Sequence, residues 1–260
     1  PTEPPRPAPD VASELSPALA PLAWWLGDWD VENGSGSEHW VAAAGAIYGV
    51  AMSASSGFDV MIVDDGEGPG KPDGVLRFIV FPDGERAVEF RKRTLGERAA
   101  LFASDAHDFP KTLDYRRDGE ALVAEIGGGK NERFRFRRGR AHPAPELEAA
   151  DRAFSDDTGR RGVDGWVAAF DPGGSMLRQG AKVAGAQIGE VMRPLLTSGR
   201  LAWAPIASGR TEALGFTVGK ATFTGAKPED SWRSTYVTIW RKQPDGSWKV
   251  LFDTGRVVQE

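Results

Sequence analysis

The sequence predicts two successive folding units, an up-and-down β-barrel followed by an α+β unit. Between residues 20 and 138, short apolar runs alternate with turn sequences such as "PDGE" and "GGGKN", a pattern typical of antiparallel hairpins. A polar, proline-bearing break at residues 139–146 ends this pattern. From residue 147 onward, helical spacing comes first and strand-like runs follow, which predicts a curved antiparallel sheet wrapped over helices.

The barrel is predicted from a series of runs that follow one another without a long connection. Because consecutive hairpins need no crossover, eight or more such runs favour a closed barrel over a sandwich. A proline-rich segment at residues 1–19 precedes them, and we expect it to be a disordered tail. The runs are "EHWVAAAGAIYGVAM", "FDVMIVDD", "GVLRFIVF", "RAVEFRKRTL", "RAALFAS", "KTLDYRRDG", "ALVAEIG" and "ERFRFRR".

The second unit, residues 147–260 after a linker at 139–146, begins with three predicted helices. Pro145 suits the start of the first helix, and Trp166 and Phe170 lie four residues apart in the second. The third predicted helix contains Pro194, which shortens or kinks it. Four strand-like runs follow, and "PDGS" between the last two predicts a hairpin. These runs cover residues 200–210, 213–225, 233–243 and 247–258.

Composition excludes several classes of function. The formal net charge of −5 argues against a nucleic-acid-binding surface. The chain has no cysteine, which excludes disulfides and thiolate chemistry, and its three histidines lack metal-ligand spacing. No run approaches about 18 apolar residues, so we expect no membrane insertion. We expect a bacterial periplasmic or secreted protein whose signal peptide has been removed, since a cysteine-free chain suits an oxidising compartment.

Both halves resemble known families. "RGVDGWVAAF", "ALGFTVGKATFTG" and "YVTIWRKQPDGSWKVLFDTG" make the C-terminal half similar to the nuclear transport factor 2-like superfamily, in its SnoaL-like and ketosteroid-isomerase-like branch. This resemblance implies a cone of curved sheet with a pocket at its open end. "WLGDWDV" and "RFRFRR" make the N-terminal half resemble a bacterial lipocalin-like domain family. That second resemblance implies that Trp29 closes the barrel base, and it carries no defined reaction.

The known catalytic residues of ketosteroid isomerases are not retained. Such enzymes use a carboxylate base and an oxyanion hole of a tyrosine and a protonated aspartate. The resemblance places these three groups near Leu177 or Arg178, near Phe154 and near Thr238. Because none of these residues matches, we expect a different set of groups to carry any chemistry.

Strand alternation and the resemblance together predict the residues of the pocket. We assign Lys220 as general base or Schiff-base amine, Arg178 as anion clamp and Tyr236 as oxyanion donor. The alternative is that Lys220 points to solvent, because a shift of one residue exchanges the two faces of a strand. Lys220 lies in "GFTVGKATFTG", which has neither the spacing nor the following helix of a phosphate-binding loop. Substrate-binding residues are predicted to be Phe216, Val218, Trp203, Ser234, Thr238 and Trp240.

The predicted function is cofactor-independent acid/base chemistry on a small aromatic or polycyclic compound, of the lyase or isomerase type. The alternative is a non-catalytic protein that binds or carries small hydrophobic molecules. In a third interpretation, the exposed face of the C-terminal sheet serves only for homodimerisation. Neither a metal nor an organic cofactor is expected.

Overall fold

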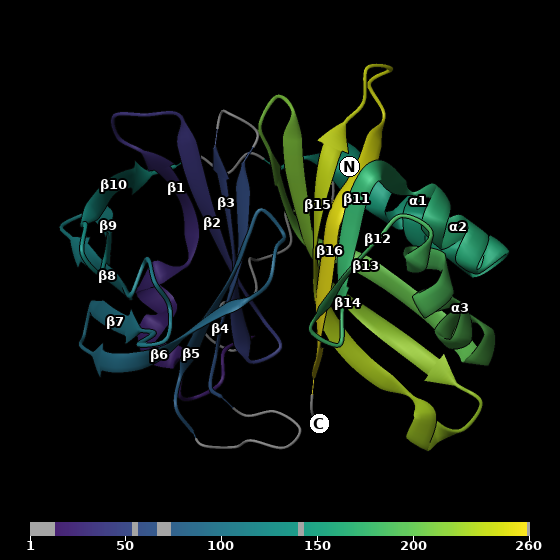
Figure 1. Ribbon diagram of the computed structural model, residues 1–260, viewed down its shortest axis with the longest axis horizontal. Helices are drawn as coiled ribbons and strands as arrows, with labels where there is room; N and C mark the ends of the chain where they lie inside the picture. Colours follow the sequence, from purple (N-terminus) through teal and green to yellow (C-terminus); the bar gives the residue numbers. More distant parts are fainter. Residues whose placement is uncertain (1–13, 54–56, 67–73, 140–142, 259–260) are drawn as a thin grey trace, which may run out of the picture.

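A computed structural model describes residues 14–53, 57–66, 74–139 and 143–258. It consists of a β-barrel and a six-stranded sheet covered by helices, lying side by side (Figure 1). Most of the predicted tail at 1–19, and the middle of the predicted linker at 139–146, lie outside the described residues. Within the tail, Leu19 is fully buried and Leu15 pairs with Gly45, so this part belongs to the packed structure.

The barrel is closed, as the hairpin pattern predicts. Each strand pairs antiparallel with the next, and the first strand pairs with the last, Trp29 opposite Arg138. Short turns join most of the strands, which is the connectivity of an up-and-down barrel. The strands are β1 (Gly27–Val31), β2 (Gly36–Ala43), β3 (Ala46–Ser53), β4 (Phe58–Asp64), β5 (Arg77–Pro82), β6 (Val88–Leu95), β7 (Ala99–Ala103), β8 (Thr112–Asp118), β9 (Ala121–Gly127) and β10 (Glu132–Arg138).

Aromatic side chains fill the barrel interior. A short 3-10 helix, η2 (Ala20–Trp25), places Trp25 inside, where its ring lies 4.2 Å from that of Tyr115 and 4.8 Å from that of Trp40. Trp29 is fully buried, and the guanidinium groups of Arg117 and Arg138 lie over its ring, 4.6 and 4.8 Å from the centroid. Such cation–π contacts fix the ring, and this packing role for Trp29 agrees with the prediction. Membership of a lipocalin-like family remains a prediction.

The second sheet is mixed rather than wholly antiparallel. Its order is β12-β11-β16-β15-β14-β13, and β11 pairs parallel with β16. The expectation of a purely antiparallel sheet is therefore wrong for this pair, because β11 and β16 are joined through the rest of the sheet rather than by a hairpin. The predicted hairpin at "PDGS" joins β15 and β16. The strands are β11 (Phe170–Arg178), β12 (Ala181–Ala184), β13 (Gly199–Arg210), β14 (Leu214–Gly225), β15 (Trp232–Lys242) and β16 (Trp248–Val258).

Three helices cover one face of this sheet near the predicted positions, but the second ends at Ala168, so Phe170, which was predicted to be helical, begins β11. They are α1 (Pro145–Arg161), α2 (Val163–Ala168) and α3 (Gln187–Ser198), and a single 3-10 turn, η3 (Pro228–Asp230), precedes β15. Helix α1 begins with proline and acidic residues and ends with arginines, which complements the helix dipole. Its buried residues recur at helical spacing and face the sheet.

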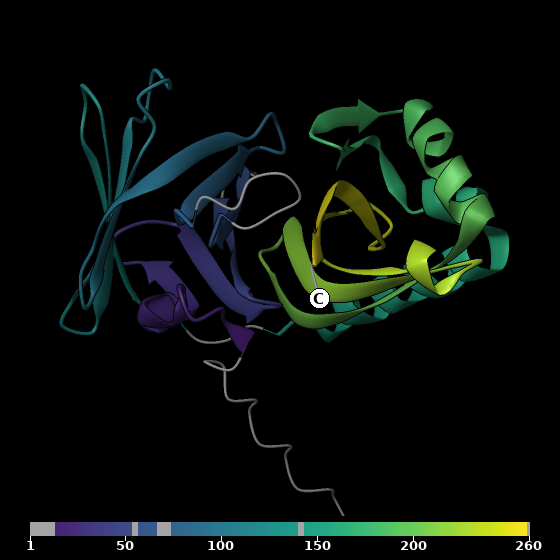
Figure 2. The same cartoon turned by 90° about the horizontal axis from the view of Figure 1, so that it is seen from below.

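The opposite face of the sheet packs against the barrel. The sheet lies between the barrel and the helices (Figure 1), and Figure 2 shows it curving away from the barrel around the helical side. One apolar cluster spans both parts, so the face predicted to serve a homodimer is covered within the chain itself. A homodimer remains a proposal that requires another surface. The cluster includes Tyr48, Val50, Phe58, Val60, Ile62 and Phe81 of the barrel and Phe216, Val218, Val237, Ile239 and Phe252 of the sheet.

Candidate functional site

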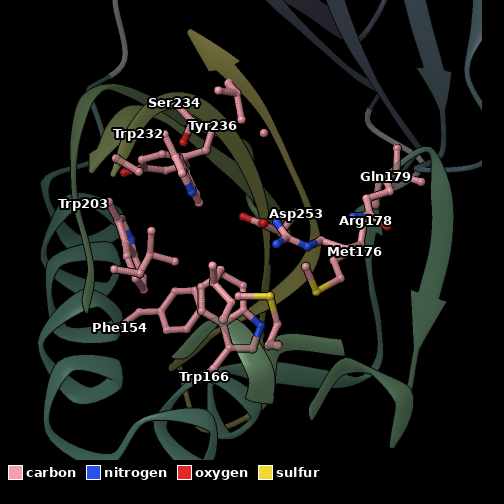
Figure 3. Close-up of a pocket in the computed structure, with 17 residues that line it drawn as sticks. Phe154, Trp166, Met176, Arg178, Gln179, Trp203, Trp232, Ser234, Tyr236 and Asp253 are labelled. Atoms are coloured by element: carbon pink, nitrogen blue, oxygen red, sulfur yellow. The ribbon is translucent and has the colours of Figure 1, made fainter. Parts of the chain in front are cut away.

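A pocket of about 290 Å³ lies between the concave face of the second sheet and its helices. Figure 3 shows Trp203, Trp232 and Tyr236 on one side of it, with Asp253 and Arg178 on the other. Mostly apolar and aromatic side chains line it, together with a few convergent polar groups, which is the usual character of a small-molecule site. It is lined by Phe154, Trp166, Met176, Leu177, Arg178, Gln179, Met192, Leu195, Leu201, Trp203, Ala221, Trp232, Ser234, Tyr236, Asp253, Gly255 and Val257.

Asp253 is the acidic group of this pocket. Strand β16 presents it on the concave face, directly opposite Thr238, whose hydroxyl donates to Asp253 Oδ2 at 2.7 Å. Burial raises the pKa of the Asp253 carboxyl to about 7, and the charge of Asp151 adds to this effect, while Thr238 and Arg178 oppose it. A carboxyl group of this pKa exchanges protons readily near neutral pH.

Arg178 lies beside Asp253. It is the last residue of β11, and the turn after it is closed by Gln179 and Gly180 with φ of 52° and 79°. Parallel pairing of Met176 with Asp253 brings the end of β11 next to the acid. The guanidinium group points into the pocket (Figure 3), and its charge acts on the Asp253 carboxyl. Arg178 therefore lines the pocket, and its role as an anion clamp stays a prediction.

Tyr236 lines the pocket, but its hydroxyl proton is already used. It donates to Asp151 Oδ2 at 2.7 Å, and Trp203 Nε1 donates to the other oxygen of the same carboxyl, also at 2.7 Å. Asp151 is fully buried in α1; burial raises its pKa, and the hydrogen bonds from Tyr236 and Trp203 oppose that rise. Burial and the nearby Asp151 also raise the pKa of Tyr236. Tyr236 and Trp203 are thus held as a fixed wall.

Lys220 is not in the pocket, and its predicted position is wrong. Its ammonium group pairs with Glu14, with Nζ 2.9 Å from Oε2, on the barrel side of the sheet. The reason is register: Gly219 pairs with Tyr236, and directly paired residues of antiparallel strands present side chains on the same face. The odd-numbered residues of β14 therefore face the pocket. The even-numbered ones, Phe216, Val218 and Lys220, face the barrel.

Glycine at position 219 makes the wall possible. A Cβ atom built there would lie 2.2 Å from the Tyr236 hydroxyl oxygen, so a larger residue would displace that ring.

On the barrel side, the Phe216 ring lies 4.9 Å from that of His39. Phe216 and Val218 therefore bind the barrel rather than a substrate.

Of the residues predicted on β15 and β13, three line the pocket, while Thr238 and Trp240 lie outside its lining. Ser234, Tyr236 and Trp203 line the pocket. Thr238 lies on the same face and holds Asp253. Trp240 packs deeper in the helix-side core, where its Nε1 donates to Thr217 Oγ1 at 2.9 Å. These observations place side chains and leave catalytic roles as proposals.

Sequence reasoning missed Asp253 and Asp151, although both carry a recognisable signal. In "VLFDTG", Asp253 is a lone acid within an apolar strand. In α1, the buried positions are Leu147, Asp151, Phe154, Ser155 and Thr158, and Asp151 occupies the helical stripe where an apolar residue is expected. A buried acid at such a position needs donors, and those donors line the pocket.

The other acid with a strongly raised pKa lies inside the barrel. Glu38 accepts hydrogen bonds from Trp40 Nε1 at 2.9 Å and from the Tyr115 hydroxyl at 3.0 Å, and burial raises its pKa to about 7. The two donors, Trp40 and Tyr115, belong to the packed core of the barrel, so we assign Glu38 a structural role. Within the described residues, no cluster of three metal-ligating side chains occurs, and no helix has the length and hydropathy needed to cross a membrane.

Comparison with known proteins finds similar folds for part of the chain. No protein-family model matches it, and no curated protein matches it. Among solved structures, it is similar to a ketosteroid isomerase-like protein from Erwinia carotovora atroseptica at 16% identity and a TM-score of 0.40, covering 45% of this chain and 96% of that one.

It is also similar to an NTF-2-like protein of unknown function from Shewanella oneidensis, at 13% identity and a TM-score of 0.37, covering 43% of this chain and 96% of that one. An NTF2-like protein with a cystatin-like fold from Novosphingobium aromaticivorans shows 13% identity and a TM-score of 0.38, covering 44% and 81%. At these scores no residue role is carried over to this chain.

Proposed function

We propose that the pocket binds a small aromatic carbonyl compound and that Asp253 transfers a proton to and from one of its carbon atoms. The observation that carries this proposal is the place of Asp253, a carboxyl group in a largely apolar pocket with a pKa of about 7. A general base is most effective when its pKa lies near the working pH. The reaction class is that of an isomerase or lyase without a metal or organic cofactor.

The chemistry follows from the two groups on one side of the pocket. The ionised Asp253 carboxylate removes a proton from the carbon next to the carbonyl, and the electron pair moves to the carbonyl oxygen. Arg178 stabilises the resulting enolate oxygen, because a positive charge acts strongly in a poorly hydrated site. Protonated Asp253 then returns the proton to the same or a conjugated carbon, which completes an exchange or an isomerisation.

The opposite side of the pocket supports ring binding. Trp203 and Trp232 offer aromatic surface, and Phe154 packs edge-on against Trp203, with ring centroids 4.7 Å apart. The hydrogen bond from Trp203 to Asp151 keeps the indole in one orientation. A pocket of about 290 Å³ is at the small end of ligand sites, which favours one or two rings over a larger polycycle.

Hydrogen–deuterium exchange of 2-tetralone, an enolisable bicyclic ketone, tests this proposal. In deuterated buffer near pH 7, followed by NMR, we expect the protein to accelerate exchange above the buffer rate. Asp253→Asn should lower this acceleration about 100-fold or more, the usual contribution of a general base. Asp245→Asn is the matched control, because Asp245 is exposed in the β15–β16 turn and bonds Ser247.

Two outcomes would overturn the enzymatic proposal. One is the absence of acceleration by the wild-type protein, and the other is equal acceleration by wild type and Asp253→Asn. If 2-tetralone binds without exchange, the pocket is a binding site for small hydrophobic molecules, which is the alternative function. Circular dichroism of the variants checks that the fold is retained.

A further inference from the structure

Arg178 differs from those arginines of the second sheet that have acidic partners. Arg241 pairs with Asp171 at 3.1 Å, and Arg210 pairs with Glu146. Arg178 forms no hydrogen bond or ion pair with any other described residue, although it is only partly exposed and points into the pocket (Figure 3). A guanidinium group has five N–H donors in a planar fork that matches an anionic oxygen group.

When Asp253 is protonated, no nearby acid compensates the positive charge of Arg178. Asp151 accepts hydrogen bonds from Tyr236 and Trp203, so it is committed to the wall. Asp253 is held by Thr238 and carries a full charge only above about pH 7. Below that pH, the pocket therefore presents one cation beside a neutral carboxylic acid, which is itself a hydrogen-bond donor.

We propose that the ligand is an aromatic compound with an ionised oxygen substituent, that Arg178 binds this oxygen, and that Asp253 takes up a proton when the anion enters. This inference rests on the proposed function only for the part played by Asp253, because an anion beside protonated Asp253 corresponds to the enolate state that follows proton removal in the proposed reaction. The ring lies against Trp203 and Trp232, across the pocket from the charged pair. The ligand's negative charge then meets Arg178 and the Asp253 hydroxyl, and no pair of like charges is left in an apolar site.

The groups that face Asp253 determine the direction of the proton linkage. They are Arg178 on β11, Asp151 on α1, and Thr238 and Tyr236 on β15. An anion beside Asp253 disfavours its charged form, so binding must be coupled to proton uptake wherever Asp253 is ionised in the free protein. Affinity for the anion should therefore fall as the pH rises through about 7.

Calorimetric titration with matched probes tests the inference. 2-Naphthoate should bind about tenfold or more tightly than the neutral 2-naphthamide, the difference expected of a charge-assisted hydrogen bond. Arg178→Met should weaken naphthoate binding about tenfold or more and leave naphthamide binding within about twofold. Arg210→Met removes the same charge at an exposed ion pair and should change neither affinity.

Two further titrations determine which kind of anion binds and whether binding takes up a proton. The enolate of 2-hydroxy-1,4-naphthoquinone, compared with its methyl ether, distinguishes enolates from carboxylates, and a preference for the anion in either pair supports the inference. Titration in buffers of different ionisation enthalpy should show uptake of up to about half a proton near pH 7, lost in Asp253→Asn.

Equal affinity for anion and neutral analogue in both pairs would overturn the inference, as would an Arg178→Met variant with unchanged naphthoate affinity. Such a result leaves Asp253-dependent exchange of the neutral 2-tetralone intact if the proposed function holds. Conversely, anion preference together with Asp253-independent exchange would refute the proposed function and keep the anion site.

Discussion

Replacing Asp253 by asparagine should make the protein more stable at alkaline pH. In the folded state burial raises the pKa of this carboxyl from the ordinary 3.8 to about 7. Between these two values, the folded protein holds a proton that the unfolded chain releases, so the free energy of unfolding falls as the pH rises. Above about pH 7 the folded state carries the full cost of a charged carboxylate in the pocket.

The size of this effect follows from the pKa. Raising the pKa from 3.8 to about 7 corresponds to at most about 4 kcal/mol. Because Asp253 keeps partial contact with the pocket's solvent, we expect about half of this limit, ~2 kcal/mol in favour of Asp253→Asn near pH 8. Near pH 4, where the carboxyl is protonated in the folded protein, the two proteins should differ little.

Chemical denaturation followed by tryptophan fluorescence, at several pH values between about 4 and 8, measures this difference. Glu38 has a similarly raised pKa, so Asp253→Asn should reduce the pH dependence without abolishing it. Asp245→Asn should give no gain, because hydrogen bonds from Ser247 lower the pKa of Asp245. A wild-type protein that is more stable than Asp253→Asn at pH 8, or a difference that does not vary with pH, would refute the reasoning.

Two further substitutions test the placement of side chains around the sheet. Lys220→Met should leave 2-tetralone exchange and ligand affinity unchanged and alter stability by less than about 1 kcal/mol, since its partner Glu14 forms a surface ion pair; a loss of exchange would contradict the observed register. Phe252→Ala should lower the free energy of unfolding by about 3–5 kcal/mol, because this fully buried ring packs between the barrel and the sheet. Phe134→Ala, at an exposed ring of the barrel, is its control in the same denaturation measurement and should cost far less.

Hairpin signals and helical spacing predicted the barrel hairpins, the three helices and the last four strands, but not β11 and β12, which lie between α2 and α3. The closed barrel, the three helices and the hairpin at "PDGS" depend on local sequence. Hydrophobic periodicity and turn residues therefore predict them directly. The parallel pairing of β11 with β16 cannot be predicted in this way, because it joins segments about 75 residues apart and no local pattern specifies the partner.

The face of β14 could not be assigned from the sequence because both of its faces are buried over most of its length. Phe216 and Val218 pack against the barrel, while Thr217 and Gly219 lie on the helix side. Alternation distinguishes the two faces of a strand only when one of them meets water. On β15 the predicted face is the observed one, since Ser234, Tyr236 and Thr238 share one face with Asp253, but of these only Ser234 and Tyr236 line the pocket.

The two faces of β16 connect the barrel to the candidate site. Phe252 packs against Phe58 and Phe81 of the barrel, with ring centroids 5.8 and 6.4 Å apart. The next residue, Asp253, points to the opposite side and lines the pocket. Because successive side chains of a strand alternate, the packing of one ring fixes the direction of the neighbouring carboxyl. We infer that the barrel holds β16 in position from behind, so that it supports the acid without contributing a residue to the pocket lining.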